Sequence, residues 1–251
     1  MQLKLVIVGG NAEQWIDRCL SSVSNQTDSN WEACVVLDPV GDKTIERAQK
    51  YASDKIKIIA NRTQQFQNLN FLRAIKELNP DDEDIIVLGP DADDWLYDSK
   101  ALSIVRNYYE NYPELLATYG GLARLINNKI QFFSEKVVQN HKTFTEQQFK
   151  QGIRKFWSGC HLKTVKYKLF KRIKYEDILD PQGEPLQVNG DMAVMVPIFE
   201  MAGFDRVKRI NEILYVYNHS TPFMDEKCKK DEQLRIRAYL ESKPPYERFE
   251  D

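Results

Sequence analysis

The chain has 251 residues, enough for one large domain with a hydrophobic core of its own. Hydrophobic residues make up 42% and charged residues 29%, as in soluble globular proteins. The 35 basic and 37 acidic residues leave a net charge of −2, so the basic excess typical of nucleic-acid-binding proteins is missing and no nucleic-acid partner is expected.

The sequence contains no apolar run as long as a membrane span, and its start lacks the architecture of a signal peptide. We therefore expect a soluble, cytoplasmic protein with no transmembrane segment. The four cysteines have no CxxC spacing, which argues against a structural zinc site or a disulfide framework.

The first hundred residues alternate between short apolar runs and amphipathic stretches. The apolar runs predict strands at residues 3–8, 32–37, 56–60 and 84–88. The amphipathic stretches predict a helix capped by Asn11, a second over 42–52 and a third over 66–78. Strands that alternate with helices indicate an α/β fold with a parallel sheet covered by helices.

Beyond residue 95 the alternation is looser. A helix is expected near 98–111, followed by short strands at 115–119, 122–126 and 130–133, with turns at Gly120–Gly121 and Asn127–Asn128.

The last third combines basic, helical and strand-like stretches. Residues 163–174 alternate and carry six basic residues in twelve. A helix capped by Asn189 should run to Met201 and end before Gly203. Two strands at 207–210 and 213–217, a charged helix from Asp225 and a frayed end complete the expected elements. Without a linker rich in Gly, Ser or Pro, the chain is expected to form one compact unit.

The most informative motif is the acidic run that follows the fourth strand. Asp91, Asp93 and Asp94 would repel one another unless a cation or hydrogen-bond donors compensate. Oxygen ligands on a short loop suit Mg²⁺ or Mn²⁺, although a solvated acidic turn that caps the next helix is the alternative. Trp95–Leu96 follows at once and favours an anchored loop.

Two other strand ends should lie at the same edge of the sheet, where open parallel sheets bind ligands. Gly9–Gly10 follows the first strand and permits close backbone approach to a ligand, or makes an ordinary turn. Asp38 follows the second strand. Neither GxGxxG nor GxxxxGK[ST] is present, so no known phosphate-binding loop is indicated.

Three stretches together resemble the nucleotide-binding half of family 2 glycosyltransferases with the GT-A fold. They are VIVGGNAEQWIDRCLSSVSNQ, ACVVLDPVGDKT and DIIVLGPDADDWL. The resemblance covers residues 3–96 and continues more faintly to about 219, through GDMAVMVPIFEMAG and INEILYVYNHS.

The resemblance implies a GT-A fold: a Rossmann-like, mostly parallel sheet flanked by helices, with a smaller β region on the acceptor side. One domain would span residues 1–222, in which 1–97 bind the nucleotide sugar and 98–222 bind the acceptor. Residues 223–251 would form a C-terminal helix and tail.

The resemblance also implies roles for individual residues. Asp38 would accept hydrogen bonds from the nucleotide base, and Gly9 and Gly10 would lie along that base. Asp91 would touch the ribose, and Asp93 would bind the metal. Asp191 would be the general base, and His219 matches a position where some relatives supply a metal ligand.

The implied reaction is an inverting transfer from a nucleotide-diphosphate sugar, with UDP as the commonest nucleotide that the resemblance implies and Mn²⁺ or Mg²⁺ as cofactor. The acceptor would be a glycan, a lipid-linked molecule or a protein, and peripheral membrane contact is compatible with this function.

The sequence departs from the family pattern at several positions. Gly9–Gly10 replaces Pro-Thr or Pro-x, and Asp38–Pro39 replaces Asp-Asp. Pro90 precedes the acids, and Gly190–Asp191 replaces Glu-Asp. The missing acid leaves a non-catalytic GT-A-like domain, which binds a sugar or a partner, as an alternative. An Asp-x-Asp phosphohydrolase is disfavoured because Gly89–Pro90 interrupts the strand.

Other residues keep a structural alternative. Without the resemblance, Asp191 is a charge at a helix start, and His219 has a surface or core role. His161 lines the acceptor pocket or is structural, and His141 lies in a loop. The basic stretch 163–174 is a solvated strand face, or a patch for an anionic acceptor, a diphosphate or a membrane surface.

Overall fold

The structure is a computed structural model that describes residues 1–127, 129–131, 143–158, 161–223 and 228–250. Its strands are β1 Leu3–Gly9, β2 Trp31–Leu37, β3 Ile56–Ala60, β4 Ile85–Leu88, β5 Trp95–Leu96, β6 Ala117–Ile126, β7 Lys129–Gln131, β8 Lys163–Lys166 and β9 Val207–Asn218. Its α-helices are α1 Ile16–Ser24, α2 Thr44–Ala48, α3 Phe66–Leu78, α4 Ala101–Asn111, α6 Glu146–Lys150, α7 Tyr167–Phe170, α8 Gly190–Ala202 and α10 Lys230–Ser242. Four 3₁₀ turns are η1 Gln49–Tyr51, η2 Ile153–Phe156, η3 Tyr175–Ile178 and η4 Phe204–Arg206.

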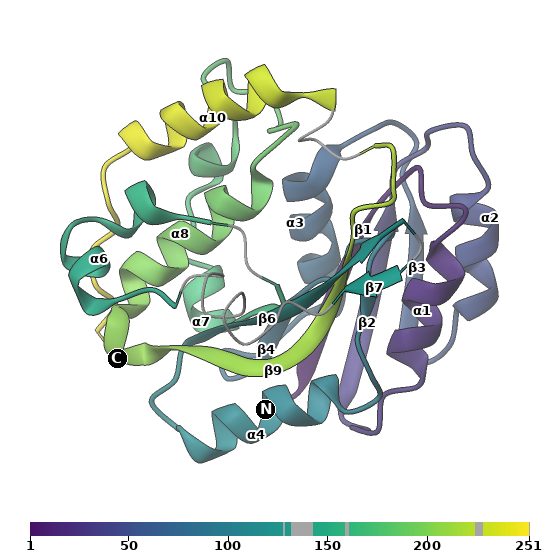
Figure 1. Ribbon diagram of the computed structural model, residues 1–251, viewed down its shortest axis with the longest axis horizontal. Helices are drawn as coiled ribbons and strands as arrows, with labels where there is room; N and C mark the ends of the chain where they lie inside the picture. The colour runs from purple at the N-terminus through teal and green to yellow at the C-terminus, as the bar shows by residue number, and fades with distance from the viewer. Residues whose placement is uncertain (128, 132–142, 159–160, 224–227, 251) are drawn as a thin grey trace.

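Within these residues all strands belong to one nine-stranded sheet (Figure 1). The order is β3-β2-β1-β4-β8-β6-β9-β5, and β7 pairs with β6. β1, β2, β3, β4, β6 and β9 run in one direction, whereas β5, β7 and β8 run against them. The expected α/β architecture with a mostly parallel sheet is therefore present, and the later strands extend the same sheet.

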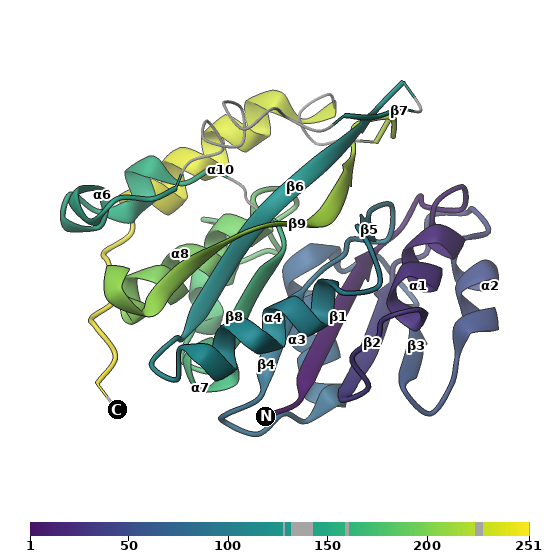
Figure 2. The same cartoon turned by 60° about the horizontal axis from the view of Figure 1, so that its bottom comes forward.

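Helices cover both faces of this sheet, which explains why the central strands are apolar throughout. Val6 and Val8 of β1 pack on the side of α3 and α8, and Leu5 and Ile7 pack on the side of α1 and α4. Figure 2 shows α4 and α1 in front of the sheet, with α8 behind it. None of the helices in the described part of the chain is long and apolar enough to cross a membrane.

The two longest strands were expected as four short ones. The chain does not turn at Gly120–Gly121; β6 continues through it and pairs with β9, with register shifts on both sides of Gly121. A Cβ on Gly121 would lie 3.1 Å from the carbonyl oxygen of Glu212, so the glycine allows β9 to approach closely at this bulge. The two strands expected at 207–210 and 213–217 are likewise one strand, β9.

Of the two predicted asparagine caps, Asn189 occupies the N-cap position of α8 and Asn11 does not cap α1, and neither side chain makes a capping bond. α1 begins at Ile16, four residues later than a cap at Asn11 requires, and Asn11 itself has a left-handed backbone with φ of 53°. Asn189 does precede α8, but its side chain does not cap the helix and instead donates to the carbonyl oxygen of Gln233 in α10, at 2.7 Å.

The basic stretch 163–174 is not a solvated strand face. The strand β8 ends at Lys166, and the chain then turns into α7. Lys163 and Lys166 are buried, whereas Lys171, Arg172 and Lys174 are exposed.

Three further expectations fall outside the described residues: residues 132–133 of the strand expected at 130–133, the loop position of His141, and residues 225–227 at the start of the last helix. The described helix at this end is α10.

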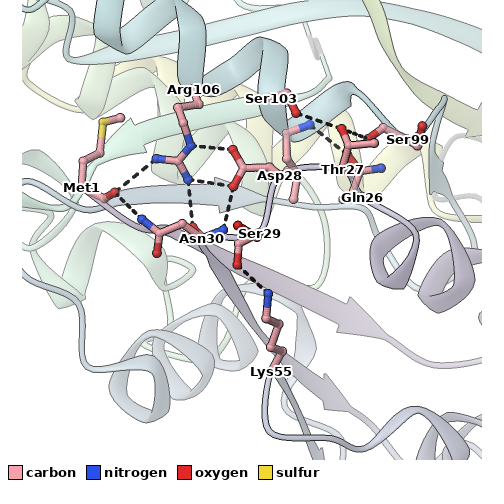
Figure 3. A network of polar contacts seen from close by, with 11 residues as sticks. Met1, Gln26, Thr27, Asp28, Ser29, Asn30, Lys55, Ser99, Ser103 and Arg106 are labelled. Atoms are coloured by element: carbon pink, nitrogen blue, oxygen red, sulfur yellow. Dashed lines mark hydrogen bonds and ion pairs between the residues drawn. The ribbon is translucent and has the colours of Figure 1, made fainter.

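At the amino ends of β1 and β2, a polar network attaches α4 to the loop before β2 (Figure 3). The guanidinium of Arg106 donates to Asp28 Oδ1 at 3.0 Å and to the carbonyl oxygens of Asn30, at 2.9 Å, and Met1, at 3.2 Å. The network fixes the edge of the sheet opposite the strand ends that carry the glycines and aspartates.

Candidate functional site

The carboxyl ends of β1, β2 and β4 border a cavity of about 570 Å³. All five residues predicted to bind the nucleotide line it: Gly9, Gly10, Asp38, Asp91 and Asp93. Asp94 lines it too, so four of the described lining residues are aspartates and one, Lys229, is basic. We call this cavity the acidic cleft.

The acidic loop is held in place by β9. Asp94 is 2% exposed; the hydroxyl of Tyr215 donates to its Oδ2 at 2.6 Å, and the backbone N–H of Asn218 donates to its Oδ1 at 2.7 Å. The side chain of Asn218 donates to the carbonyl oxygen of Asp93, and the N–H of Asp91 donates to the Tyr215 hydroxyl, both at 3.1 Å. Asp94 therefore anchors the loop that carries Asp91 and Asp93.

Burial, together with the charges of Asp93 and Asp91, raises the pKa of Asp94 well above its usual range. The same three carboxylates act on Cys19, whose thiol pKa is raised first by burial and then by Asp94, Asp93 and Asp91. The negative potential of the loop thus reaches the helix behind it.

The two glycines allow neighbouring loops to pack closely. A Cβ on Gly9, whose φ is 155°, would lie 2.7 Å from the Cβ of Ala92, and the Ala92 N–H donates to the carbonyl oxygen of Val8 at 3.0 Å. A Cβ on Gly10 would lie 3.2 Å from the carbonyl oxygen of Asp38. Gly9 therefore lets the acidic loop seat against the end of β1.

Asp38 shapes the loop before α3. Its carboxylate accepts hydrogen bonds from the Asn61 side chain at 2.6 Å, the Gln65 N–H at 3.1 Å and the Phe66 N–H at 2.9 Å. Phe66 has a left-handed backbone with φ of 63°, a conformation that costs about 1–3 kcal/mol in a residue other than glycine. The bond to Asp38 helps to offset that strain, and Asp38 still borders the acidic cleft.

A second cavity, of about 720 Å³, adjoins the acidic cleft, and Gln67, Asp91 and Tyr217 line both. Its described lining residues include four cations: Arg124, Lys163, Lys230 and Arg237. We call it the basic cavity. The predicted base Asp191 and both described histidines, His161 and His219, lie here.

Asp191 lies in the first turn of α8 and forms an ion pair that the sequence did not indicate. Its Oδ2 lies 3.2 Å from Nζ of Lys163 on β8, and its Oδ1 accepts from the Met192 N–H at 2.8 Å. The Lys163 side chain is 4% exposed and that of Asp191 is 24% exposed. The carboxylate thus reaches the cavity while a buried ammonium holds it.

His161 belongs to a stack of rings on one wall of the basic cavity. Its ring centroid lies 4.6 Å from that of Tyr215 and 5.5 Å from that of Tyr217. Burial, and then the charge of Lys163, lower its pKa well below the usual range. A neutral, stacked imidazole at this wall supports its neighbours in the sheet.

The two predicted metal ligands line different cavities. Asp93 borders the acidic cleft, whereas His219 borders the basic cavity, where its ring centroid lies 4.8 Å from that of Tyr217 in a T-shaped contact. Within the described residues, no three His, Cys, Asp or Glu side chains form a group that could hold a metal ion.

The residues nevertheless suit a divalent cation that a ligand helps to bind. Asp91 and Asp93 offer only oxygen donors, and Mg²⁺ commonly takes one or two carboxylates and completes its shell with waters and substrate phosphates. The donor set therefore fits a cation shared with a bound phosphate better than a cage made by the protein alone.

Gln67 joins the two cavities and was missed in the sequence. Its amide nitrogen lies 3.5 Å from Oδ1 of Asp91. A Cβ on Gly190 would lie 2.5 Å from its Oε1 and 2.6 Å from Oδ1 of Asn68. The start of α3 thus packs directly against Gly190, where the family pattern has a glutamate.

The sequence is similar to known glycosyltransferases. The family model described as "Glycosyl transferase family 2" matches residues 5–179. An uncharacterized glycosyltransferase of Haemophilus influenzae is 33% identical over 75 residues, which are 29% of this chain and 22% of that protein.

Solved structures resemble the whole described fold at low identity. S. aureus TarS 1–349 in complex with UDP has a TM-score of 0.65 and 17% identity, and the match covers 96% of this chain and 65% of that one. Glucosyl-3-phosphoglycerate synthase from Mycobacterium tuberculosis has a TM-score of 0.59 and 13% identity, and the match covers 98% of this chain and 82% of that one. The chain thus spans less than two thirds of the TarS fragment and about a fifth of the curated relative.

Proposed function

The chain belongs to glycosyltransferase family 2 and has the expected GT-A fold, and from this premise we propose that it transfers a sugar from a nucleotide-diphosphate sugar to an acceptor hydroxyl. One observation carries the proposal: the acidic cleft and the basic cavity adjoin at Asp91, with Asp191 in the second. A donor in the cleft and an acceptor in the cavity would meet between these two carboxylates.

For the donor we propose a UDP-sugar. The related structures were crystallised with UDP, with UDP-GlcNAc, with UDP and Mn²⁺, and in one case with GDP-Man and Mn²⁺, so a GDP-sugar is the competing donor. In the proposed arrangement, Gly9, Gly10 and Asp38 border the base and Asp91 borders the ribose.

We assign the cation site to Asp93, with Asp91 beside it, and keep His219 as a further ligand to be tested. A bound Mn²⁺ or Mg²⁺ supplies positive charge that offsets the negative charge of the diphosphate. Asp94 acts indirectly, because its bonds to Tyr215 and Asn218 hold the loop that carries both ligands.

Asp191 is proposed as the general base. As the acceptor oxygen forms its bond to the anomeric carbon, the bond from that carbon to the diphosphate breaks, and Asp191 takes the proton from the acceptor hydroxyl. Attack from the face opposite the leaving diphosphate inverts the anomeric centre. The Lys163 ammonium lies 3.2 Å from the Asp191 carboxylate, which belongs to the first turn of α8.

The structure bears differently on the two alternative functions. β4 ends at Leu88, so Asp91 and Asp93 lie on a loop beyond the strand, which does not support the phosphohydrolase. A non-catalytic binding domain stays the second candidate, favoured by Gly190 in place of the glutamate; it would bind a nucleotide sugar without releasing the sugar.

A panel of UDP- and GDP-sugars with Mn²⁺ or Mg²⁺ tests the proposal by release of the nucleoside diphosphate. Asp191→Asn should lower turnover by about 10²–10⁴-fold, the usual contribution of a general base, and leave UDP affinity unchanged. Asp231→Asn is the matched control, because Asp231 lies in the first turn of α10 and is exposed. Binding of a donor without release would favour the binding domain, and full activity of Asp191→Asn would exclude this base.

A further inference from the structure

The two adjoining cavities carry opposite charge. Among the residues that the structure describes, four aspartates and one lysine line the acidic cleft, whereas four cations and two aspartates, Asp91 and Asp191, line the basic cavity. A cleft rich in carboxylates attracts a cation. By the same electrostatic argument, the basic cavity attracts an anion.

The four cations converge from separate parts of the chain. Arg124 comes from β6, Lys163 from β8, and Lys230 and Arg237 from α10. Figure 2 shows α10 on the side of the molecule toward which the far ends of β6 and β9 run. Because the four cations come from three elements, they are not simply the solvated charged face of one helix.

Two of the four cations form ion pairs within the protein, one with an acid of the lining and one with an acid outside it. Lys163 pairs with Asp191. Arg237 pairs with Glu241 at 2.8 Å, and its Nη2 donates to the carbonyl oxygen of Trp157 at 3.1 Å. Of the two acids in the lining, Asp91 is shared with the acidic cleft. Lys163 is buried and Arg237 is half-buried, so their charges act through a less polar medium than water.

The rest of the lining suits a hydroxyl compound. Asn189 and Gln233 bring amide groups to the lining, and Tyr217 brings a phenol. A sugar or polyol can form hydrogen bonds with these groups.

We propose that the acceptor is an anion: a hydroxyl compound with a phosphate or carboxylate group, which the basic cavity binds so that the hydroxyl meets Asp191. This inference rests on the proposed function, since it names the class of acceptor. The same cations could instead serve the diphosphate of the donor, and the experiment must separate these two sources of an oxyanion.

The probe is inorganic phosphate, titrated by calorimetry into the full chain saturated with UDP and Mg²⁺. With the donor diphosphate site occupied, phosphate should still bind, and the affinity should fall as the salt concentration rises. Arg237→Gln should weaken phosphate binding about tenfold, as expected for a lost charged hydrogen bond. Arg235→Gln is the matched control, because Arg235 lies on the same helix, is exposed and pairs with Glu232.

Three results would overturn the inference: no phosphate binding to the UDP-saturated protein, equal loss in both arginine variants, or competition between phosphate and UDP. Competition would assign the cations to the donor. Sugar release from a donor, with no phosphate site, would leave the transferase intact and make the acceptor neutral. Phosphate binding without any sugar release would uphold the anion site while the proposed function fails.

Discussion

At the scale of single residues, the three aspartates of the acidic run have different roles. Asp91 and Asp93 border the acidic cleft, whereas Asp94 is buried and accepts from Tyr215 and Asn218. The sequence shows only three neighbouring carboxylates, because the partners of Asp94 lie more than a hundred residues away on β9. The structure thus separates an anchor from the residues proposed to bind the ligand.

The anchor should leave a signature in the pH dependence of stability. The pKa of Asp94 is raised in the folded state, first by burial and then by Asp93 and Asp91. The folded protein therefore holds this proton more tightly than the unfolded chain, and stability falls as pH rises from about 4 through the raised pKa.

Asp94→Asn removes that ionisation. The variant should therefore gain stability relative to the original protein as pH rises over the same window, so the difference in their free energies of unfolding should increase. Urea denaturation at several pH values measures it, with Asp54→Asn, an exposed position, as control. A difference between variant and original that does not change with pH would contradict the assignment.

At the scale of elements, the helices and strands with a regular hydrophobic period could be predicted from the sequence, whereas the irregular pairing of β6 with β9 could not. α3 spans the predicted residues 66–78, and β1, β2 and β4 lie within one or two residues of their predicted ends, because helical or buried-strand periodicity runs through each. Gly120–Gly121 has the composition of a turn, yet it forms a bulge, because pairing with β9 compensates for weak local preference. Such pairing joins residues about ninety positions apart and leaves no local signal.

A buried ion pair connects the elements of the second half. Arg154 of η2 donates to both carboxylate oxygens of Glu200 in α8, at 2.6 and 2.7 Å, and to the carbonyl oxygen of Leu240 in α10 at 2.9 Å. Glu200 also accepts from the Tyr246 N–H at 3.0 Å. These bonds hold α10, which carries two of the cations of the basic cavity, against α8.

Glu200→Ala should lower the free energy of unfolding by about 3–5 kcal/mol, because it leaves the Arg154 charge buried without its carboxylate. Glu232→Ala is the matched control: Glu232 forms the same two-bond pair with Arg235 but in an exposed setting, so the loss should be much smaller. Chemical denaturation of both variants compares them. Equal losses would mean that burial adds nothing to this pair.

At the scale of the whole molecule, the sheet explains which part of the site could be predicted. Gly9, Asp38 and Asp91 follow neighbouring parallel strands, so their convergence follows from the topology. The contact between Asp191 and Lys163 could not be predicted, because it depends on how α8 packs beside β8. The basic cavity was missed for the same reason, since its cations come from three elements that no motif connects.

The central claim is that the acidic loop binds a nucleoside diphosphate together with a divalent cation. Calorimetric titration of UDP with and without Mn²⁺ tests it most directly, in the original protein and in Asp93→Asn. The account predicts that UDP binding requires Mn²⁺ and weakens at least tenfold in Asp93→Asn. Equal UDP affinity in the presence of a chelator, or an unchanged affinity in Asp93→Asn, would contradict it.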